Sequence, residues 1–414
     1  MMEYFSEITN FYKQYKPSEL LERYGSPLYV YNEDILRLRA RQIRSLVDMP
    51  NFEISYSIKA NSNLHILEIL KEEGLHADAM SDGEIFVLQK AGYNKDHIFY
   101  VCNNVSVEEM KYAVDRGIMI SIDSLSQLIL YGKNFPATKV AVRLNPGIGA
   151  GHHQKVVTGG KTTKFGINLD KIDEILEISE RYNLKIVGIN QHIGSLFMSS
   201  TEYLRGVNEL LQTALIFKDL EFIDFGGGFG IPYKKQEGQQ PLELIQFGKD
   251  LKQLLSEWET INKKNIIFRC EPGRFVVAES AILLGKVYSR KNNYNKIFIG
   301  TDIGFSVLIR PAMYGSHHDI EIYRDEELVK DKPYESVNIT GNICESGDIL
   351  VEERELPTIK EEDIIGVMDA GAYGYSMSSN YNNRMRPAEI LIRSDGSLLQ
   401  IRKRDTYDDL LKGF

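Results

Sequence analysis

The chain of 414 residues is 43% hydrophobic, 10% aromatic and 26% charged, a composition typical of globular proteins that excludes a disordered or collagen-like chain. At roughly 150 residues per domain, this length predicts two or three domains. The net charge of -9 provides no basic surface to attract a phosphate backbone, so we expect no nucleic-acid partner.

A cytoplasmic location is predicted from the N-terminal stretch, the lack of a long apolar run and the cysteines. The N-terminal stretch mixes acidic with apolar residues, unlike a signal peptide, and no stretch approaches the ~20 apolar residues that a membrane span needs. Cys102, Cys270 and Cys344 are widely spaced, which argues against a disulfide framework and for a reducing compartment.

The first two thirds of the chain alternate short β-branched runs with stretches of helical periodicity, as repeated βα units do around a parallel sheet. Eight runs are predicted as strands, at 54–60, 76–81, 98–102, 119–124, 140–145, 185–192, 222–227 and 266–273. Helices are predicted between them, for example over 63–74, 107–117, 170–183 and 245–261. Eight such strands predict a closed (β/α)8 TIM barrel over residues 35–275.

The helical pattern fades after about Val276. Strand-like segments follow at 286–290, 296–304, 335–344, 363–371 and 389–404. The last of these contains Asp395-Gly396, a pair suited to a hairpin turn. These segments predict a second, mainly β domain over 276–414, joined by an N-terminal segment, 1–34, in which PLYVYN is a further candidate strand.

Polar residues and glycines gather where the predicted barrel strands end, which is where catalytic groups lie in such barrels. Lys59 follows an alternating apolar strand, so we expect its ammonium group to point into the barrel mouth, although most lysines are solvated surface residues. Glu271 also ends an apolar strand, where an unpaired charge would be costly. We expect a cationic partner for it, and a protonated pyridine nitrogen would serve.

Two further strand ends carry signals that are weak alone. The run Gly226–Gly228 could be a flexible turn, but after the seventh strand of a barrel its backbone N–H groups can approach a phosphate closely. His192 could be an ordinary core histidine. Because Gly194 and Ser195 follow it, we interpret it as a flat ring beside a cofactor, with a hydroxyl group available to a phosphate oxygen.

Motifs for nucleotides and metals are excluded. The segment 158–162 lacks the first glycine of a phosphate loop, and 147–151 lacks the third glycine of a dinucleotide fingerprint. The histidine pairs at 152–153 and 317–318 are adjacent rather than spaced as metal ligands on a helix, so we expect no metal. The glycines and polar residues of 152–164 permit a loop that moves over the substrate.

Six motifs, YSIKAN, HIGS, GGGFG, EPGR, CESGD and GAYGYSMSSNYN, resemble in order and spacing those of fold-type III pyridoxal-phosphate decarboxylases, and most closely the diaminopimelate decarboxylases. The resemblance runs from about Gly25 to Leu411. It implies an alanine racemase-like barrel, pyridoxal 5'-phosphate as cofactor, and conversion of meso-2,6-diaminopimelate to L-lysine and CO2.

The resemblance also implies roles for residues around the cofactor. Lys59 would hold it as a Schiff base, His192 would stack on its ring, and Glu271 would contact the pyridine nitrogen. The phosphate would be held by Ser195, Gly228, Gly273, Arg274 and Tyr373. Asp78 and Arg143, also at strand ends, would support the lysine.

The resemblance assigns substrate contacts to residues late in the chain. The distal carboxylate of diaminopimelate would bind Arg274, Arg310 and Tyr314, with Tyr373 nearby, and Glu345 would accept the distal ammonium. Cys344 would return a proton to the reacting carbon; the alternative is a small buried apolar residue. The CESGD loop would reach the neighbouring subunit's site, which implies a homodimer with shared active sites.

One residue departs from the family pattern, and three other functions stay open. Cys102 stands where relatives are expected to have glycine, and is either tolerated or makes the site sensitive to oxidation. The alternatives are a decarboxylase of ornithine, lysine, arginine or a carrier-bound amino acid, a racemase of the same cofactor class, and a binding protein without activity.

Overall fold

The computed structural model describes residues 4–147 and 163–414, which form two compact units. The barrel unit comprises Arg39–Ile231 and Pro241–Val276, and the sheet unit comprises Met1–Leu38, Pro232–Gln240 and Val277–Phe414. The segments singled out at 147–151, 152–153, 158–162 and 152–164 lie wholly or largely outside the described residues.

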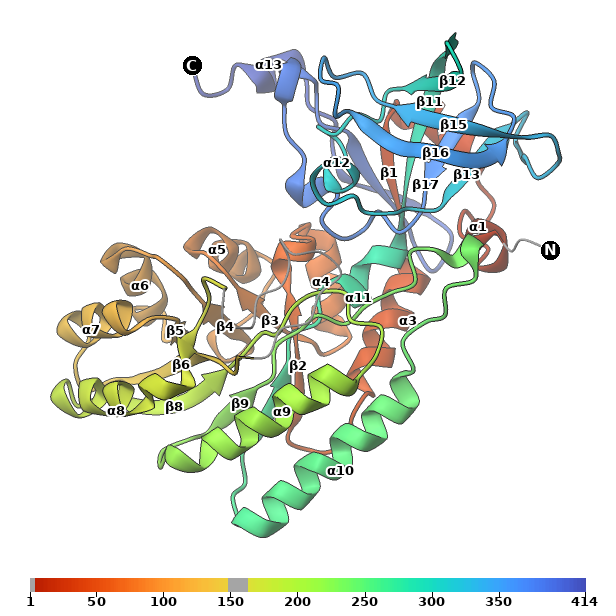
Figure 1. Cartoon of the computed structure of the whole chain (residues 1–414). Coiled ribbons are helices and arrows are strands. Elements are labelled where there is room, and N and C mark those ends of the chain that lie inside the picture. Colours follow the sequence, from red (N-terminus) through yellow and green to blue (C-terminus); the bar gives the residue numbers. More distant parts are fainter. Residues whose placement is uncertain (1–3, 148–162) are drawn as a thin grey trace. The chain divides into compact units, whose positions relative to one another are not determined.

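The barrel unit is a closed ring of parallel strands with helices outside it (Figure 1). Its eight strands are β2 (Phe52–Ser57), β3 (His76–Ala79), β4 (Ile98–Val101), β5 (Met119–Ile122), β6 (Lys139–Asn145), β8 (Lys185–Asn190), β9 (Phe222–Asp224) and β10 (Ile267–Cys270). Pairing between β5 and β6 closes the ring, and the short strand β7 (Ile167–Asn168) pairs with β6. The predicted fold class, a (β/α)8 barrel with a second mainly β part, is confirmed.

The helices that accompany these strands follow the βα pattern. They are α3 (Glu33–Arg44), α4 (Leu64–Glu72), α5 (Asp82–Lys90), α6 (Val107–Val114), α7 (Leu125–Asn134), α8 (Ile172–Arg181), α9 (Thr201–Thr213) and α10 (Leu244–Asn262). Several begin at a serine or asparagine that caps the helix, as Ser106 does by accepting the Glu109 N–H at 3.2 Å. None of the helices in the described ranges is long and apolar enough to cross a membrane.

Most of the predicted strands run a few residues too far, and at Lys59 the difference matters. The strand expected to end at Ala60 ends at Ser57, and Ile58–Ala60 form a 3-10 turn. The Ser57 N–H donates to the Pro272 carbonyl, and the ladder stops there. Lys59 therefore lies on a turn beyond the strand. The sequence pattern did not reveal this turn, because Ile58–Ala60 continue the apolar pattern of the strand.

Aromatic packing fills the interior of the barrel. Phe99 on β4 and Phe222 on β9 meet edge to face with ring centroids 5.2 Å apart, although these strands are not neighbours in the ring. A Cβ atom on Gly188 would lie 2.1 Å from the Phe222 ring. The glycine therefore makes room for the phenylalanine, as close packing requires.

The sheet unit is built on a mixed sheet in which the N-terminal strand is central. β1 (Leu28–Asn32) lies between β11 (Ala281–Asn293), antiparallel to it, and β18 (Ala388–Ile392), parallel to it. The other strands are β12 (Lys296–Thr301), β13 (Ile320–Arg324), β14 (Glu327–Leu328), β15 (Tyr334–Thr340), β16 (Ile349–Pro357), β17 (Ile364–Val367) and β19 (Leu398–Arg402). Its short helices are α1 (Phe5–Ile8), α2 (Pro17–Tyr24), α12 (Arg310–Tyr314) and α13 (Tyr407–Leu410), while α11 (Arg274–Val277) lies at the end of the barrel unit.

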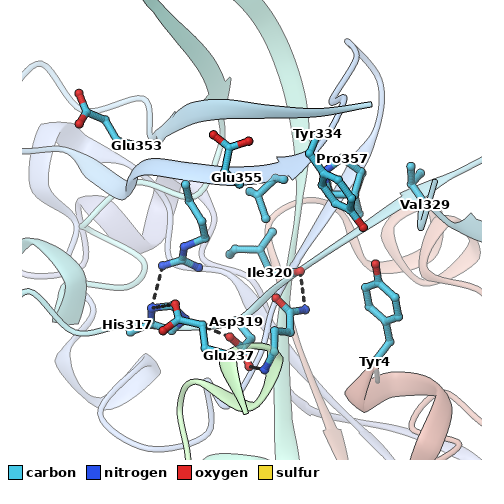
Figure 2. Close-up of a pocket in the computed structure, with 14 residues that line it drawn as sticks. Tyr4, Glu237, His317, Asp319, Ile320, Val329, Tyr334, Glu353, Glu355 and Pro357 are labelled. Atoms are coloured by element: carbon cyan, nitrogen blue, oxygen red, sulfur yellow. Dashed lines mark hydrogen bonds and ion pairs between the residues drawn. The ribbon is translucent and has the colours of Figure 1, made fainter. Parts of the chain in front are cut away.

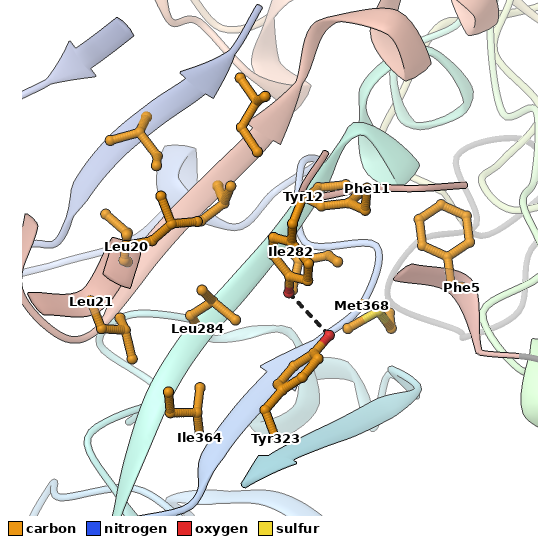
Figure 3. Packing of buried hydrophobic residues seen from close by; sticks show 14 of the residues in the cluster. Phe5, Phe11, Tyr12, Leu20, Leu21, Ile282, Leu284, Tyr323, Ile364 and Met368 are labelled. Carbon is orange, nitrogen blue, oxygen red and sulfur yellow. Dashed lines mark hydrogen bonds between the residues drawn. The ribbon is translucent and has the colours of Figure 1, made fainter. Parts of the chain in front are cut away.

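Residues far apart in the sequence form the core of the sheet unit (Figure 3). Phe11 and Leu20 from the N-terminal segment pack with Ile282 on β11. The hydroxyl groups of Tyr12 and Tyr323 lie 3.1 Å apart inside this cluster, so the polar ends of both rings have partners. The turn expected at Asp395-Gly396 joins β18 to β19 as an antiparallel hairpin.

We expect Phe222→Ala to lower the free energy of unfolding by about 3–5 kcal/mol, because it leaves a cavity in the barrel interior. Ile261→Ala is the control, since Ile261 is 77% exposed and should change stability by less than about 0.5 kcal/mol. Urea unfolding of the purified proteins measures both. Equal losses for the two variants would contradict the interior packing.

Candidate active site

Lys59 stands at the carboxyl end of β2 with a distant counter-ion. Its Nζ lies 3.9 Å from Asp78 Oδ2 and 3.9 Å from Met80 Sδ, and its side chain is 36% exposed. Neither Asp78 oxygen has a hydrogen-bond partner in the described part of the chain. Burial raises the pKa of Asp78, and Lys59 opposes that rise. The lysine nitrogen is thus accessible from the barrel mouth and held beside an acceptor for its proton.

Glu271 follows β10 and Asp224 is the last residue of the adjacent strand β9, and both are buried. Burial, reinforced by Asp224 and Asp78, raises the pKa of Glu271 well above its usual range. Burial likewise raises the pKa of Asp224 to about 7. The Oε1 atom of Glu271 has no hydrogen-bond partner among the residues described. A cation placed beside this atom would remove a desolvation cost that the protein alone does not offset.

His192, after β8, is a neutral ring in the same mouth. Its Nδ1 accepts the Gly227 N–H at 3.1 Å, so that nitrogen carries no proton. Burial, together with the charges of Lys59 and Arg143, lowers the pKa of His192 well below its usual range. The ring can therefore lie against a flat group without adding a positive charge.

Arg143, near the end of β6, is the second cation of the mouth and is 7% exposed. Burial lowers the pKa of its guanidinium, and Glu271, Asp123 and Asp78 oppose that change. Sequence reasoning named Arg143 and Asp78 but missed Asp123 and Asp224. A signal for both was available, because each is a carboxylate within an otherwise uncharged predicted strand, 119–124 and 222–227.

The run Gly226–Gly228 is required by the packing of the chain on itself. A Cβ on Gly227 would lie 1.9 Å from the Glu271 carbonyl oxygen, and one on Gly228 would lie 2.3 Å from that of Gly194. Gly226 and Gly228 also have φ values of +74° and +106°, which glycine adopts readily. The glycines thus bring the loops after β8, β9 and β10 into contact, whatever they bind.

Donors for an anion lie on two of these joined loops. The Arg274 Nη2 donates to the Ser195 Oγ at 3.1 Å. Gly273 permits the close approach of this loop to β2, since a Cβ there would lie 2.9 Å from the Ser57 Cβ. A guanidinium beside a hydroxyl group is a pairing suited to a phosphate.

The sheet unit presents Cys344 and Glu345 on an exposed loop. The Cys344 N–H donates to Asn382 Oδ1 at 3.1 Å, and Glu345 Oε1 accepts the Tyr381 hydroxyl at 2.5 Å. Asp348 fixes the end of the loop by accepting two backbone N–H groups, at 2.6 and 2.8 Å. The Cys344 thiol is exposed, so the interpretation of Cys344 as a small buried apolar residue is wrong.

Arg310 and Tyr314 begin and end α12 in the same unit. Arg310 is 2% exposed; its Nη1 lies 2.7 Å from His318 Nε2, and its guanidinium lies over the Tyr233 ring, 4.6 Å from the centroid. Tyr373 has a φ of +56°, a conformation that is uncommon outside glycine. The structure thus gathers the predicted cofactor residues in the barrel unit, except for Tyr373, and holds the later residues in the sheet unit.

Comparison with known proteins identifies the family. Residues 35–278 match the model for the pyridoxal-dependent decarboxylase, pyridoxal binding domain. The chain is 40% identical over 407 residues to a diaminopimelate decarboxylase of Methanothermobacter thermautotrophicus, covering 95% of this chain and 93% of the relative. It is 35% identical over 415 residues to the Escherichia coli K12 enzyme of that name, covering 94% and 93%. The chain belongs to the diaminopimelate decarboxylase family.

Solved structures of the diaminopimelate decarboxylase family share the fold over nearly the whole chain. One crystal structure of a diaminopimelate decarboxylase superposes with a TM-score of 0.88 at 32% identity, covering 95% of this chain and 94% of the other. The Helicobacter pylori protein, complexed with L-lysine, gives 0.86 at 28% identity, covering 95% and 98%.

Pyridoxal phosphate is the cofactor of this family, and the barrel mouth fits it. The fit rests on the buried Glu271 oxygen that lacks a hydrogen-bond partner in the described part, which suits a protonated pyridine nitrogen. An accessible amine on Lys59, a neutral ring at His192 and the Ser195–Arg274 donor pair complete the set. No cluster of histidine, cysteine and carboxylate side chains that could hold a metal ion is found in the described ranges.

Cys102, the departure from the family pattern, is 1% exposed at the end of β4. Its thiol lies 3.3 Å from the Ser121 carbonyl oxygen, and burial raises its pKa. Since the thiolate is the form that reacts with oxidants, this environment favours the interpretation that the cysteine is tolerated over that of an oxidation-sensitive site.

We expect the cofactor-free Glu271→Gln variant to melt at a higher temperature than the parent at pH 8. A carboxyl group whose pKa is raised by folding binds more protons in the folded state than in the unfolded state. Its cost therefore grows as the pH rises above the unfolded value. The variant lacks that cost, and each kcal/mol corresponds to about 2–4 °C.

Thermal unfolding of both proteins at pH 5 and pH 8 checks this expectation, and the difference should shrink at pH 5. Glu221→Gln is the control, because the Glu221 side chain is 51% exposed. A Glu271→Gln protein that is no more stable than its parent at pH 8 would contradict the inferred strain at this carboxyl group.

Proposed function

We propose that this chain decarboxylates meso-2,6-diaminopimelate to L-lysine and CO2, with pyridoxal phosphate bound on Lys59. The observation that carries the proposal is the identity of 40% over nearly the whole chain with a diaminopimelate decarboxylase. The site agrees with it, because an accessible lysine, a neutral histidine and a buried carboxyl group gather at one barrel mouth.

When bound, pyridoxal phosphate supplies an electron sink for the electron pair that remains after CO2 departs. Lys59 would hold the cofactor through its amine, and Asp78 would take up or return the proton of that amine. Glu271 would accept a hydrogen bond from the pyridine nitrogen and keep it protonated, and the neutral ring of His192 would cover one face. Arg143 balances the charge of the buried carboxylates.

The phosphate group is assigned to donors on the loops joined by the glycine run. They are the Ser195 hydroxyl, the backbone at Gly228, Gly273 and Arg274, and the Tyr373 hydroxyl. The barrel domain, 35–275, would thus carry most of the cofactor contacts. The domain 276–414, with segment 1–34, would carry most of the residues that select the substrate.

Substrate choice rests on the distal end of diaminopimelate, a carboxylate that ornithine and lysine lack. Arg274 and Arg310 suit that carboxylate because guanidinium groups bind carboxylates in a bidentate manner. Tyr314 and Tyr373 add hydroxyl donors, and Glu345 accepts the distal ammonium.

Cys344 returns the proton to the carbon that has lost CO2. Its thiol and Glu345 are exposed on a loop whose end is fixed by Asp348. This exposure supports the proposal that the loop completes the active site of another subunit. The working unit would be a cytoplasmic homodimer with shared active sites. We expect no nucleic-acid partner, because the net charge is -9.

The test is CO2 release from the purified protein with pyridoxal phosphate, given meso-diaminopimelate, L-ornithine, L-lysine or L-arginine in separate reactions. We expect release from diaminopimelate alone, with L-lysine as product. Lys59→Ala should lose both the activity and the visible absorbance of the lysine-bound cofactor. Release only from ornithine or lysine would keep the cofactor chemistry and overturn the roles of Arg310 and Glu345.

Cys344→Ala should slow product formation by about 10²–10⁴, the usual contribution of a positioned acid, while the visible absorbance of bound cofactor persists. Cys102→Ala is the matched control and should keep its rate, because Cys102 is buried and has no assigned role. Steady-state kinetics and absorbance spectra measure both variants. Full activity in Cys344→Ala would refute its role as proton donor.

A further inference from the structure

A cavity of about 270 Å³ lies within the sheet unit (Figure 2). Its walls come from β13, β16, the start of β15 and the segment 236–237. None of the residues given a role in the proposed reaction lines it. Ligand pockets for drug-sized molecules begin near 300 Å³, so this volume suits a ligand no larger than an amino acid.

One side of the cavity carries a guanidinium group that forms no direct ion pair with a carboxylate of the described residues. Arg354 donates from Nη1 to the His318 carbonyl oxygen at 2.5 Å and from Nη2 to His317 Nδ1 at 3.1 Å. Within the described residues it makes no ion pair; burial lowers the pKa of its side chain, and Asp319 and Glu237 oppose that change. Since arginine has five N–H donors, it can still bind an anion that enters the cavity.

The neighbours of Arg354 hold it in place, and Asp319 and Glu237 act on its charge without forming an ion pair with it in the described residues. Because an arginine nitrogen only donates, His317 Nδ1 is an acceptor, and its Nε2–H donates to Asp319 Oδ1 at 3.0 Å. The other Asp319 oxygen accepts the Gln236 N–H at 2.9 Å. The Asp319 carboxylate is therefore occupied by its own chain.

The other side and the floor of the cavity are mainly apolar. Figure 2 shows His317, Asp319 and Glu237 on one side, and Tyr4, Tyr334, Val329 and Pro357 on the other. Ile320, Ile322 and Leu356 also line the cavity and are each less than 5% exposed. A ligand here would meet a cation at one end and hydrocarbon along its length.

The rim of the cavity is acidic, which favours a ligand that carries an ammonium group over one that carries a second carboxylate. Glu237 pairs with Lys234 at 3.1 Å and Glu353 with Lys296 at 2.6 Å, whereas Glu355 is exposed and makes no ion pair in the described part. A second negative charge on the ligand would be repelled by this rim, and an ammonium group would be attracted.

We propose that this cavity binds a free aliphatic α-amino acid. Its carboxylate pairs with Arg354, its ammonium group faces the rim at Glu355, and its side chain lies on Ile320 and Ile322. No residue with a role in the proposed reaction lines this cavity, and the inference does not depend on the proposed function.

The experiment is isothermal titration of the holoenzyme with L-leucine and with L-leucinamide, which keeps the ammonium and the side chain but lacks the carboxylate. Prior borohydride reduction locks the cofactor on its lysine, so that the ligand forms no covalent bond to the cofactor. We expect L-leucinamide to bind at least about ten-fold more weakly than L-leucine, the usual worth of a charged hydrogen bond.

Two variants locate the site. Arg354→Met should weaken L-leucine binding about ten-fold, and Val329→Trp should abolish it by filling the cavity without touching the polar side. Arg205→Met is the matched control, because the Arg205 side chain is 65% exposed in the barrel unit, and it should bind as the parent does. If Arg354→Met does not fold, Val329→Trp decides alone.

Several outcomes would overturn the proposal. These are equal affinity for L-leucine and L-leucinamide, parental affinity in the Val329→Trp holoenzyme, and no detectable heat with L-leucine. Because neither ligand is diaminopimelate or its product, a failure here leaves the proposed decarboxylase activity untouched.

Discussion

The site depends on one electrostatic constraint, the gathering of several buried carboxyl groups at the barrel mouth. Buried carboxyl groups gather at the ends of neighbouring strands, and the cations that act on Glu271 are Lys59 and Arg143. Desolvation disfavours the charged form of each acid, and the acids disfavour one another. These two effects raise the pKa of Glu271 well above its usual range. A bound group that carries a positive charge relieves this strain, so cofactor binding and the electrostatics of the fold are coupled.

The barrel makes this arrangement possible because all its strands are parallel. Their carboxyl ends meet at one rim, so residues far apart in sequence share one space. The glycine run then draws three of the loops together, since any Cβ at Gly227 would collide with the Glu271 carbonyl. The same contact places the Gly227 N–H on the His192 ring. Backbone packing therefore sets both the protonation and the orientation of the histidine.

The sequence predicted the fold well because burial imposes a pattern on it. Parallel barrel strands are apolar on both faces, and all eight strands could be counted from short apolar runs. Their ends could not be placed, since the turn at Ile58–Ala60 continues the apolar pattern of β2. The reason for the glycine run also escaped sequence reasoning. Three consecutive glycines look the same in a sequence whether they bind a phosphate or allow two loops to come into contact.

The sequence by itself determined the strand count, the family motifs and the residue types that pyridoxal chemistry needs. Only the tertiary structure decided that Asp123 and Asp224 join the mouth, that Cys102 is buried and Cys344 exposed, and that Arg354 lines a cavity without an ion pair in the described residues. The physical reason is that burial, desolvation and pairing depend on neighbours distant in the chain. Motifs and periodicity, in contrast, depend on neighbours that are near.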